Sequence, residues 1–154
     1  IDGLYTDDPR TNPDAEFVSL PLFYDEKTAD LDLSAFDYVI DAIDTVSSKL
    51  LLIEKAKKAG VPIISCMGAG NKRNPALFRV MDIYQTTVCP LARVMRRELR
   101  ARGIDTLKVV FSEEEPSKIP GGRNEKGKAT PGSLPYVPPA AGLVLAAAVI
   151  EDLL

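Results

Sequence analysis

The sequence predicts an α/β fold, a Rossmann-like βαβ unit within a mixed sheet of parallel central and antiparallel strands with flanking helices. Two short apolar runs rich in β-branched residues, 38–42 and 63–66, are typical of strands covered on both faces. The segment between them, 46–59, repeats apolar residues every three or four positions, as an amphipathic helix does. This order predicts two parallel strands joined by a right-handed crossover.

Turn residues support the boundaries of this unit. Asp44 and Thr45 can cap the helix, because their side-chain oxygens can accept from its first N–H groups. Gly60 ends the helix, and Pro62 prevents its continuation. A glycine turn at 68–70 closes the second strand.

The chain before this unit has a weaker pattern. Residues 1–14 are polar and proline-containing, which favours an extended entry. Residues 15–20 alternate well enough to predict a strand. Residues 22–34 are expected to form a connection, with a short helix near 25–31.

After the glycine turn, residues 76–83 predict a strand, the first expected to leave the parallel set. Pro90 favours the first position of a helix that ends at Gly103. Residues 107–111 predict a further strand, and 112–132, rich in charge, glycine and proline, predict a flexible loop.

Composition limits the class of protein. The 154 residues suit one domain, and a composition of 45% apolar and 27% charged residues is ordinary for a soluble protein. The net charge of −3 gives no overall nucleic-acid signature, so an RNA contact would need a local patch. The absence of histidine excludes His-based triads and His-ligated zinc, and two cysteines favour a reducing cytoplasm. The closing apolar helix, opened by Pro139, is too short an uncharged run for a membrane span.

Asp44 is the main candidate for chemistry. It lies where a parallel strand passes into a helix, and ligands of open α/β sheets bind beyond the carboxyl ends of such strands. A carboxylate there can hold Mg²⁺, which neutralises phosphate oxygens. The alternative is that Asp44 only caps the helix. Asp41, inside the strand, is not expected to face solvent, and two acids three residues apart favour a cation site.

Basic residues form a second candidate site, for RNA phosphates. The loop after the glycine turn carries Lys72 and Arg73. At about 100° per residue, four arginines of the following helix share one arc, with Glu98 pointing elsewhere: Arg93, Arg96, Arg97 and Arg100. The alternative is a plain solvated face.

Cys89 precedes Pro90 at a helix N-terminus, where the macrodipole can make a thiolate more available. It is a possible nucleophile. Cys66, within a predicted buried strand, is expected to be a small core residue.

Five segments together resemble the tRNA threonylcarbamoyladenosine dehydratase family, within the ThiF/MoeB, ubiquitin-activating-enzyme-like superfamily of adenylating proteins. They are DYVIDAIDTVSSK, GVPIISCMGAGNKRNP, DIYQTTVCPLARVMRRELRARGI, VVFSEEEP and PGSLPYVPPAAGLVLAAAVIEDL. The resemblance extends from about Asn12 to Leu154.

The resemblance implies a cytoplasmic enzyme that uses ATP and Mg²⁺ to adenylate the carboxylate of threonylcarbamoyladenosine in tRNA, after which the group cyclises and AMP leaves. Asp44 matches the family's magnesium- and ATP-contacting aspartate in a D-x-x-D motif. Thr45 and Lys49 would lie near the nucleotide, although Lys49 can equally be a solvated helix lysine. This chemistry requires no enzyme nucleophile, which argues against a catalytic role for Cys89.

The chain departs from the family in one respect. The family's glycine-rich nucleotide loop and its phosphate ligands have no counterpart in residues 1–37. We therefore expect 1–154 to be the C-terminal part of a single ThiF-type domain, trimmed at its start and inactive alone.

Two other functions remain possible from the sequence. One is adenylation of a ubiquitin-like sulfur carrier, with a sulfur-transfer protein as partner; that class often has paired CxxC zinc ligands, which two cysteines 23 positions apart do not provide. The other is a non-catalytic nucleotide-binding module. The superfamily resemblance also suggests a homodimer.

Overall fold

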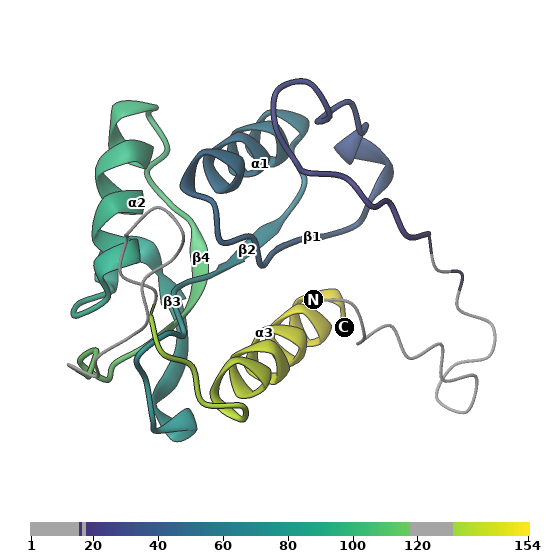
Figure 1. Ribbon diagram of the computed structural model, residues 1–154. Coiled ribbons are helices and arrows are strands. Elements are labelled where there is room, and N and C mark those ends of the chain that lie inside the picture. The colour runs from purple at the N-terminus through teal and green to yellow at the C-terminus, as the bar shows by residue number, and fades with distance from the viewer. Residues whose placement is uncertain (1–15, 17, 118–130) are drawn as a thin grey trace.

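The computed structural model describes residues 16, 18–117 and 131–154. Within them the chain forms one sheet with the strand order β1-β2-β4-β3, shown in Figure 1. The strands β1, β2 and β4 are parallel, and β3 is antiparallel to β4. The strands are β1 Val39–Asp41, β2 Ile63–Cys66, β3 Phe78–Asp82 and β4 Lys108–Ser112. The predicted mixed α/β sheet is therefore confirmed, including the strand that leaves the parallel set.

Helices cover both faces of this sheet (Figure 1). The helices α1 and α2 lie over one face and α3 over the other. The α-helices are α1 Val46–Ala59, α2 Pro90–Ala101 and α3 Val137–Leu153, and the short 3₁₀ helices are η1 Leu33–Ala35, η2 Pro75–Leu77 and η3 Ile83–Gln85. No helix among the described residues is long and apolar enough to span a membrane.

The side chains of each strand alternate between two cores. Ile63 and Val109 face α1 and α2, where Ile53 and Met95 are fully buried. Their neighbours Ile64 and Val110 face α3 and pack with residues such as Leu145. Alternation on both faces explains why the parallel strands have continuous apolar sequences.

Strand β1 is an exception, because one of its faces is open. Ile40 is 48% exposed, whereas Val39 and Asp41 on either side are buried. The prediction that this strand is covered on both faces is therefore wrong. Helix α3 packs mainly on β2, β3 and β4 and leaves Ile40, at the edge of the sheet, uncovered.

The segments before β1 also differ from the prediction. Residues 16 and 18–20 are not in a strand, and Val18 is 75% exposed. No strand of the described chain pairs with the open edge of β1, so residues 16 and 18–20 do not extend the sheet. The helix expected near 25–31 is a single turn, in which Thr28 N and Ala29 N donate to the carbonyl of Asp25.

Local chemistry explains the ends of α1. Gly60 has φ 72°, a left-handed conformation that favours glycine, and its N–H donates to the carbonyls of Ala56 and Lys57. This confirms the predicted end of the helix. The N-cap position is Thr45, whose side chain makes no capping hydrogen bond.

The loop predicted at 112–132 is described only in part. Ser112 is the last residue of β4, and residues 118–130 lie outside the described residues. The two flanks both contact Asn71, which has φ 58°. Ser117 N donates to its carbonyl at 2.8 Å, and Gly132 N donates to its Oδ1 at 2.7 Å. The turn after β2 thus joins the segment after β4 to the one that leads into α3.

Candidate functional site

The carboxyl ends of β1, β2 and β4 lie at one edge of the sheet, because these strands are parallel. Asp44 is exposed at this edge, on the short loop between β1 and α1. Within the described residues it forms no ion pair and no side-chain hydrogen bond with the first turn of α1. The interpretation of Asp44 as only a helix cap is therefore wrong, and its carboxylate is open to solvent.

Asp41 lies directly beneath this loop and is fully buried. Its Oδ1 accepts from Ile43 N at 3.0 Å, and its Oδ2 lies 2.9 Å from the Nζ of Lys49. The hydroxyl of Ser65 donates to the same Oδ2. Ser65 is the register partner of Asp41 across β1 and β2. One carboxylate therefore connects two strands, the loop and the first turn of α1.

Lys49 neither reaches toward a nucleotide nor faces solvent, which were the two interpretations from the sequence. Its side chain is 0% exposed and ion-paired with Asp41, so it is not a solvated helix lysine. It also has no open surface from which to contact a phosphate directly. The long stem of lysine allows the ammonium to reach inward from the first turn of the helix.

The glycine turn after β2 borders this edge of the sheet. A β-carbon on Gly70 would lie 2.7 Å from the Cβ of Pro131, closer than two carbons can approach. A β-carbon on Gly68 would contact Leu91, in the first turn of α2, at 3.8 Å. The turn after β2, the start of α2 and the segment entering α3 therefore meet at the edge that carries Asp44.

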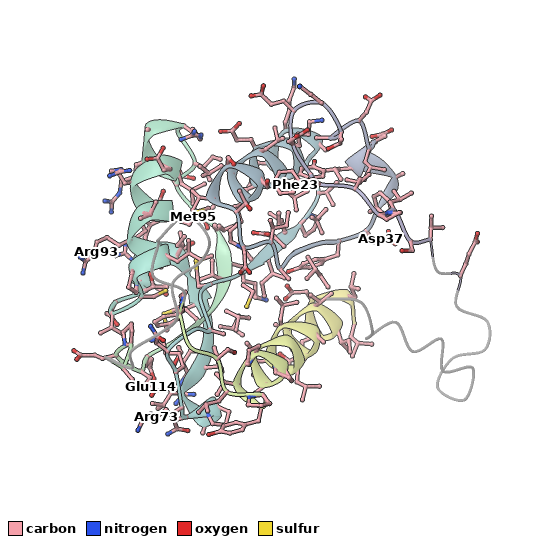
Figure 2. All side chains as sticks on the ribbon, viewed as in Figure 1. Phe23, Asp37, Arg73, Arg93, Met95 and Glu114 are labelled. Atoms are coloured by element: carbon pink, nitrogen blue, oxygen red, sulfur yellow. The ribbon has the colours of Figure 1, made fainter. Side chains whose placement is uncertain are left out.

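The basic loop after this turn is tied to the segment after β4. Lys72 is 2% exposed, and its ammonium donates to the carbonyl of Glu114. The carboxylate of Glu114 accepts from Arg73 N and Asn74 N, both at 2.9 Å; Arg73 and Glu114 are labelled in Figure 2. A buried ammonium cannot contact RNA, so the prediction that Lys72 binds tRNA phosphates is wrong for this conformation.

Burial also alters the protonation chemistry of this loop. Desolvation lowers the pKa of Lys72, and the nearby charges of Cys89, Glu114 and Glu115 oppose that shift. Burial alone would raise the pKa of Glu114, but amide hydrogen bonds from Asn74 and Arg73, with the charges of Lys72 and Arg73, lower it overall. Glu114 therefore stays ionised and holds the basic loop.

The arginines of α2 are mostly engaged within the chain. Arg96 donates to the carbonyl and hydroxyl of Thr86, and Arg100 lies 4.9 Å from the ring centre of Tyr84. Arg93 is exposed, and Figure 2 shows it pointing away from the core, opposite to the buried Met95. Within the described residues Arg93 has no ion-pair partner.

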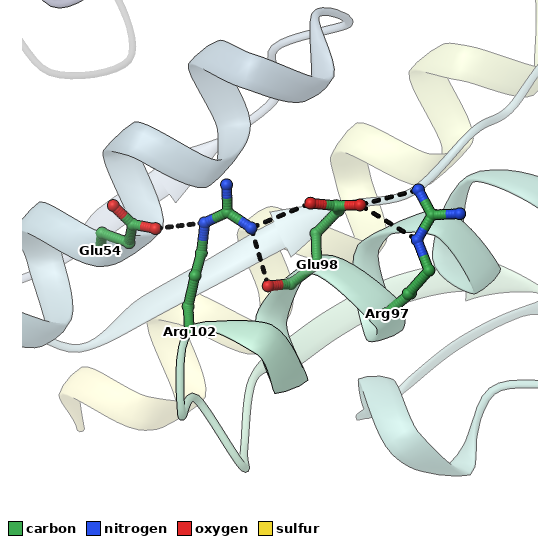
Figure 3. A network of polar contacts seen from close by, with 4 residues as sticks. All are labelled: Glu54, Arg97, Glu98 and Arg102. Carbon is green, nitrogen blue, oxygen red and sulfur yellow. Dashed lines mark hydrogen bonds and ion pairs between the residues drawn. The ribbon is translucent and has the colours of Figure 1, made fainter.

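Glu98 does not point away from the arginines, as the sequence suggested. It contacts Arg97 at 2.7 Å and Arg102 at 3.0 Å, and Arg102 also pairs with Glu54 of α1 (Figure 3). The prediction failed because Arg102 lies four residues from Glu98 on the same face of the helix, and because the long side chain of Arg97 bends sideways to its neighbour. The chain of charges links α1 to the end of α2.

The two cysteines differ in burial: Cys66, expected in the core, is only partly buried, whereas Cys89 is buried. Cys89 occupies the N-cap position of α2, as predicted, but is 2% exposed. Burial raises the pKa of Cys66, and the charge of Lys49 opposes that shift. That the reaction uses no enzyme nucleophile remains a prediction.

A metal at this edge would depend on few protein ligands. Among the residues that the structure places, no three acidic, histidine or cysteine side chains gather into a cluster. Asp41 is occupied by Lys49 and Ser65, so within residues 16, 18–117 and 131–154 Asp44 is the carboxylate of this loop that has no ion-pair partner. Mg²⁺ commonly binds through one or two carboxylates together with substrate phosphates, so the donor set is compatible with that ion.

Ser65 and Glu114 are the residues that sequence reasoning missed. Ser65 sat within a predicted strand, and only the register of β1 and β2 reveals that it faces Asp41. Glu114 sat within a predicted flexible loop, and its partners are about forty residues away in the chain.

Comparison with known proteins found relatives named tRNA threonylcarbamoyladenosine dehydratase. No family model matches the chain. The chain is 39% identical over 155 residues to the tRNA threonylcarbamoyladenosine dehydratase of Bacillus subtilis, covering 93% of this chain and 61% of the relative. It is 40% identical over 100 residues to tRNA threonylcarbamoyladenosine dehydratase 2 of Saccharomyces cerevisiae, covering 60% of this chain and 22% of that protein.

Solved structures give the same result. The fold matches a crystal structure of Escherichia coli tRNA N6-threonylcarbamoyladenosine dehydratase in complex with AMP, with a TM-score of 0.79 and 25% identity over 94% of this chain and 59% of that one. A structure of the same enzyme with ATP matches over 76% of this chain and 47% of that one, with a TM-score of 0.62 and 26% identity. The chain thus spans about three-fifths of the length of the Bacillus relative.

Proposed function

We propose that this chain belongs to the tRNA threonylcarbamoyladenosine dehydratase family, to whose Bacillus subtilis member it is 39% identical, and that it is the C-terminal part of a single ThiF-type domain that adenylates a carboxylate on tRNA. The observation that carries the proposal is the exposed carboxylate of Asp44 at the exit of a parallel strand. Open α/β sheets bind their ligands at this position. The remaining nucleotide contacts would come from a region of the enzyme that corresponds to the part of the relatives outside the aligned segment.

The reaction proposed for the whole enzyme has two steps. An oxygen of the threonylcarbamoyl carboxylate attacks the α-phosphorus of ATP, and the bond to pyrophosphate breaks. An internal nucleophile of the same group then attacks the activated carbonyl carbon and loses its proton, the ring closes, and AMP leaves with the bonding electrons. One ATP becomes AMP and pyrophosphate for each water removed.

In this scheme Asp44 binds the metal–nucleotide complex. Mg²⁺, when bound, would neutralise negative charge on the phosphate oxygens. The carboxylate of Asp44 supplies the hard oxygen ligand that this ion prefers. Thr45 is exposed beside it, at the N-cap of α1, where unpaired N–H groups favour an anion. Lys49 does not contact the nucleotide in this scheme; it lies under the loop of Asp44 and is paired with Asp41.

The tRNA contact is proposed for the outer face of α2. This helix starts at the edge that carries Asp44, since Leu91 lies against Gly68, and it runs away from that edge. Arg93 and Arg97 are exposed along it, and the side chain of Arg97 is 77% exposed. Phosphates following the helix could reach these guanidinium groups without breaking the fold.

A salt titration separates this surface from a merely solvated face. Affinity of the complete gene product for tRNA should fall steeply with salt, and an Arg93→Glu/Arg97→Glu variant should bind more weakly with a shallower salt slope. Arg79→Glu is the control, because Arg79 is about half exposed but lies on β3, outside α2, and pairs with Glu113. Unchanged affinity in the α2 variant would leave these arginines as solvated surface.

Assembly and location are also proposals. Exposed Leu143 and Ile150 on the outer face of α3 would suit a homodimer surface. We place the enzyme in the cytoplasm, with tRNA as its partner. A sulfur-transfer protein partner stays the less favoured alternative, because no paired CxxC motif occurs in the sequence.

Nucleoside mass spectrometry tests the proposed function. A strain deleted for the gene should lose the cyclic form of threonylcarbamoyladenosine and regain it with the complete gene. Asp44→Ala should fail to restore it. Asp37→Ala is the matched control, because Asp37 is also exposed, lies seven residues earlier and precedes β1 (Figure 2). Restoration by Asp44→Ala, or no loss on deletion, would overturn the proposal.

A further inference from the structure

A fully buried ion pair lies directly under the loop that carries Asp44. It joins Asp41, the last residue of β1, to Lys49, in the first turn of α1, with both side chains 0% exposed. Nζ and Oδ2 are 2.9 Å apart, and the contact is an ion pair rather than a well-directed hydrogen bond. The sequence pattern did not predict this pair.

Stability of the core does not require charges at this place. Removing two charges from water is costly, and apolar residues of similar volume often serve a core as well or better. Apart from Ser65, the elements around the pair contribute buried apolar residues, among them Leu50 and Ile53 of α1 and Ile63 of β2. A buried pair in such a place calls for a role other than packing.

The contacts of Asp41 indicate that role. Its carboxylate accepts from the amide of Ile43, the residue immediately before Asp44, at 3.0 Å. It is itself fixed by Ser65 of β2 and by Lys49 of α1. The backbone amide of Lys49 also donates to the carbonyl of Thr45, the residue after Asp44, at 2.9 Å. The residue before Asp44 is therefore held by the carboxylate of this pair, and the residue after it by the backbone of the helix turn that carries Lys49.

We propose that Asp41 and Lys49 are positioning residues that set the direction of the Asp44 carboxylate for a metal-bound nucleotide. The inference rests on the proposed function, because it assumes that Asp44 receives Mg²⁺·ATP. It assigns Lys49 no contact with the phosphates, in contrast to the sequence-based prediction. Lys49 acts by orienting Asp41, which in turn holds the loop through Ile43.

The test is nucleotide binding by the complete gene product, measured by titration calorimetry with Mg²⁺·ATP and, separately, with AMP in the absence of Mg²⁺. Lys49→Met and Asp41→Asn should each weaken Mg²⁺·ATP binding by about tenfold or more, the size seen when groups behind a metal ligand are removed. AMP binding without metal should change little, because it does not depend on the direction of Asp44. A purely structural pair would lower the melting temperature and leave both affinities of the folded protein unchanged, and that result would overturn the proposal.

Two further variants keep the test decisive if a single charge change prevents folding. Ser65→Ala removes one contact to Asp41 without burying a new charge and should weaken Mg²⁺·ATP binding in the same direction. Lys49→Arg keeps the positive charge and should bind Mg²⁺·ATP better than Lys49→Met does. The control is Glu54→Gln, which breaks an exposed ion pair on the same helix and should leave both affinities unchanged.

Asp44→Asn distinguishes the two proposals. If it weakens Mg²⁺·ATP binding while the Asp41, Lys49 and Ser65 variants do not, only the positioning role fails. If Asp44→Asn also leaves that binding unchanged, the proposed function fails with it.

Discussion

Two buried lysines lie near the same edge of the sheet and have different partners. Lys49 is 0% exposed and faces the carboxylate of Asp41, whereas Lys72 is 2% exposed and donates to the backbone carbonyl of Glu114. A carboxylate compensates a buried positive charge more fully than a neutral carbonyl does. In agreement, desolvation lowers the pKa of Lys72.

The different partners of these two lysines show how a basic residue near this edge of the sheet should be interpreted. Both lysines were candidates for contact with a nucleotide or tRNA, and both are buried. Lys49 lies under the loop of Asp44 and is proposed to orient it, while Lys72 joins the turn after β2 to the segment after β4. The element that a buried lysine contacts, rather than its charge, indicates what it contributes.

The largest effect on stability is expected at Lys49. Lys49→Met in the complete gene product would leave the carboxylate of Asp41 buried without its counter-charge, which should cost about 3–5 kcal/mol of unfolding free energy. Urea denaturation measures this loss. A double variant, Asp41→Asn/Lys49→Met, should recover part of it, since no unpaired charge remains. A single variant as stable as the wild type would contradict the account.

A smaller loss is expected at Lys72. Lys72→Met keeps most of the aliphatic stem but leaves the partly buried carbonyl of Glu114 without that donor, which should cost about 1–3 kcal/mol. The same urea experiment, performed beside Lys49→Met, compares the two directly. An equal or greater loss at Lys72 would remove the distinction between the two lysines.

Lys72 should also make stability depend on pH. Lys72 has a lowered pKa in the folded protein, so the unfolded chain binds more protons between that pKa and the ordinary value of 10.5. Its unfavourable contribution to folding should therefore diminish as pH rises toward 10.5. Wild type should gain stability relative to Lys72→Met over that range. Urea denaturation at a series of pH values checks this, and an unchanged difference would contradict it.

The smallest effect is expected in the exposed network of Figure 3. Glu98→Gln would break contacts to Arg97 and Arg102 that are screened by water. The midpoint of urea unfolding should shift less than for either lysine variant, and the remaining shift should shrink with added salt. A shift as large as that of Lys72→Met would mean that this network stabilises the packing of α1 against α2.

Much of the fold could be predicted because its signals are local. Alternating and periodic apolar residues located β2, α1, α2 and β4, and Gly60 marked the end of α1. The antiparallel direction of β3 was also predicted correctly. The strand expected at 15–20 failed because alternation alone does not decide whether a segment pairs: residues 16 and 18–20 do not join the sheet, although the edge of β1 is open.

The site was predictable only in part, because its contacts depend on register and depth. The position of Asp44 at the exit of a strand followed from the pattern, but the burial of Lys49 did not. A lysine on the first turn of a helix looks the same in sequence whether its ammonium faces water or a carboxylate inside. Ser65 could be recognised only after the alignment of β1 with β2 placed it opposite Asp41.

The central claim, that Asp44 holds the metal of a bound nucleotide, can be measured with Mn²⁺ in place of Mg²⁺. Electron paramagnetic resonance of the complete gene product should show bound Mn²⁺ that depends on ATP. Asp44→Asn should lose this signal, and Asp37→Asn should keep it. An Asp44→Asn protein that binds Mn²⁺ with ATP as the wild type does would contradict the account.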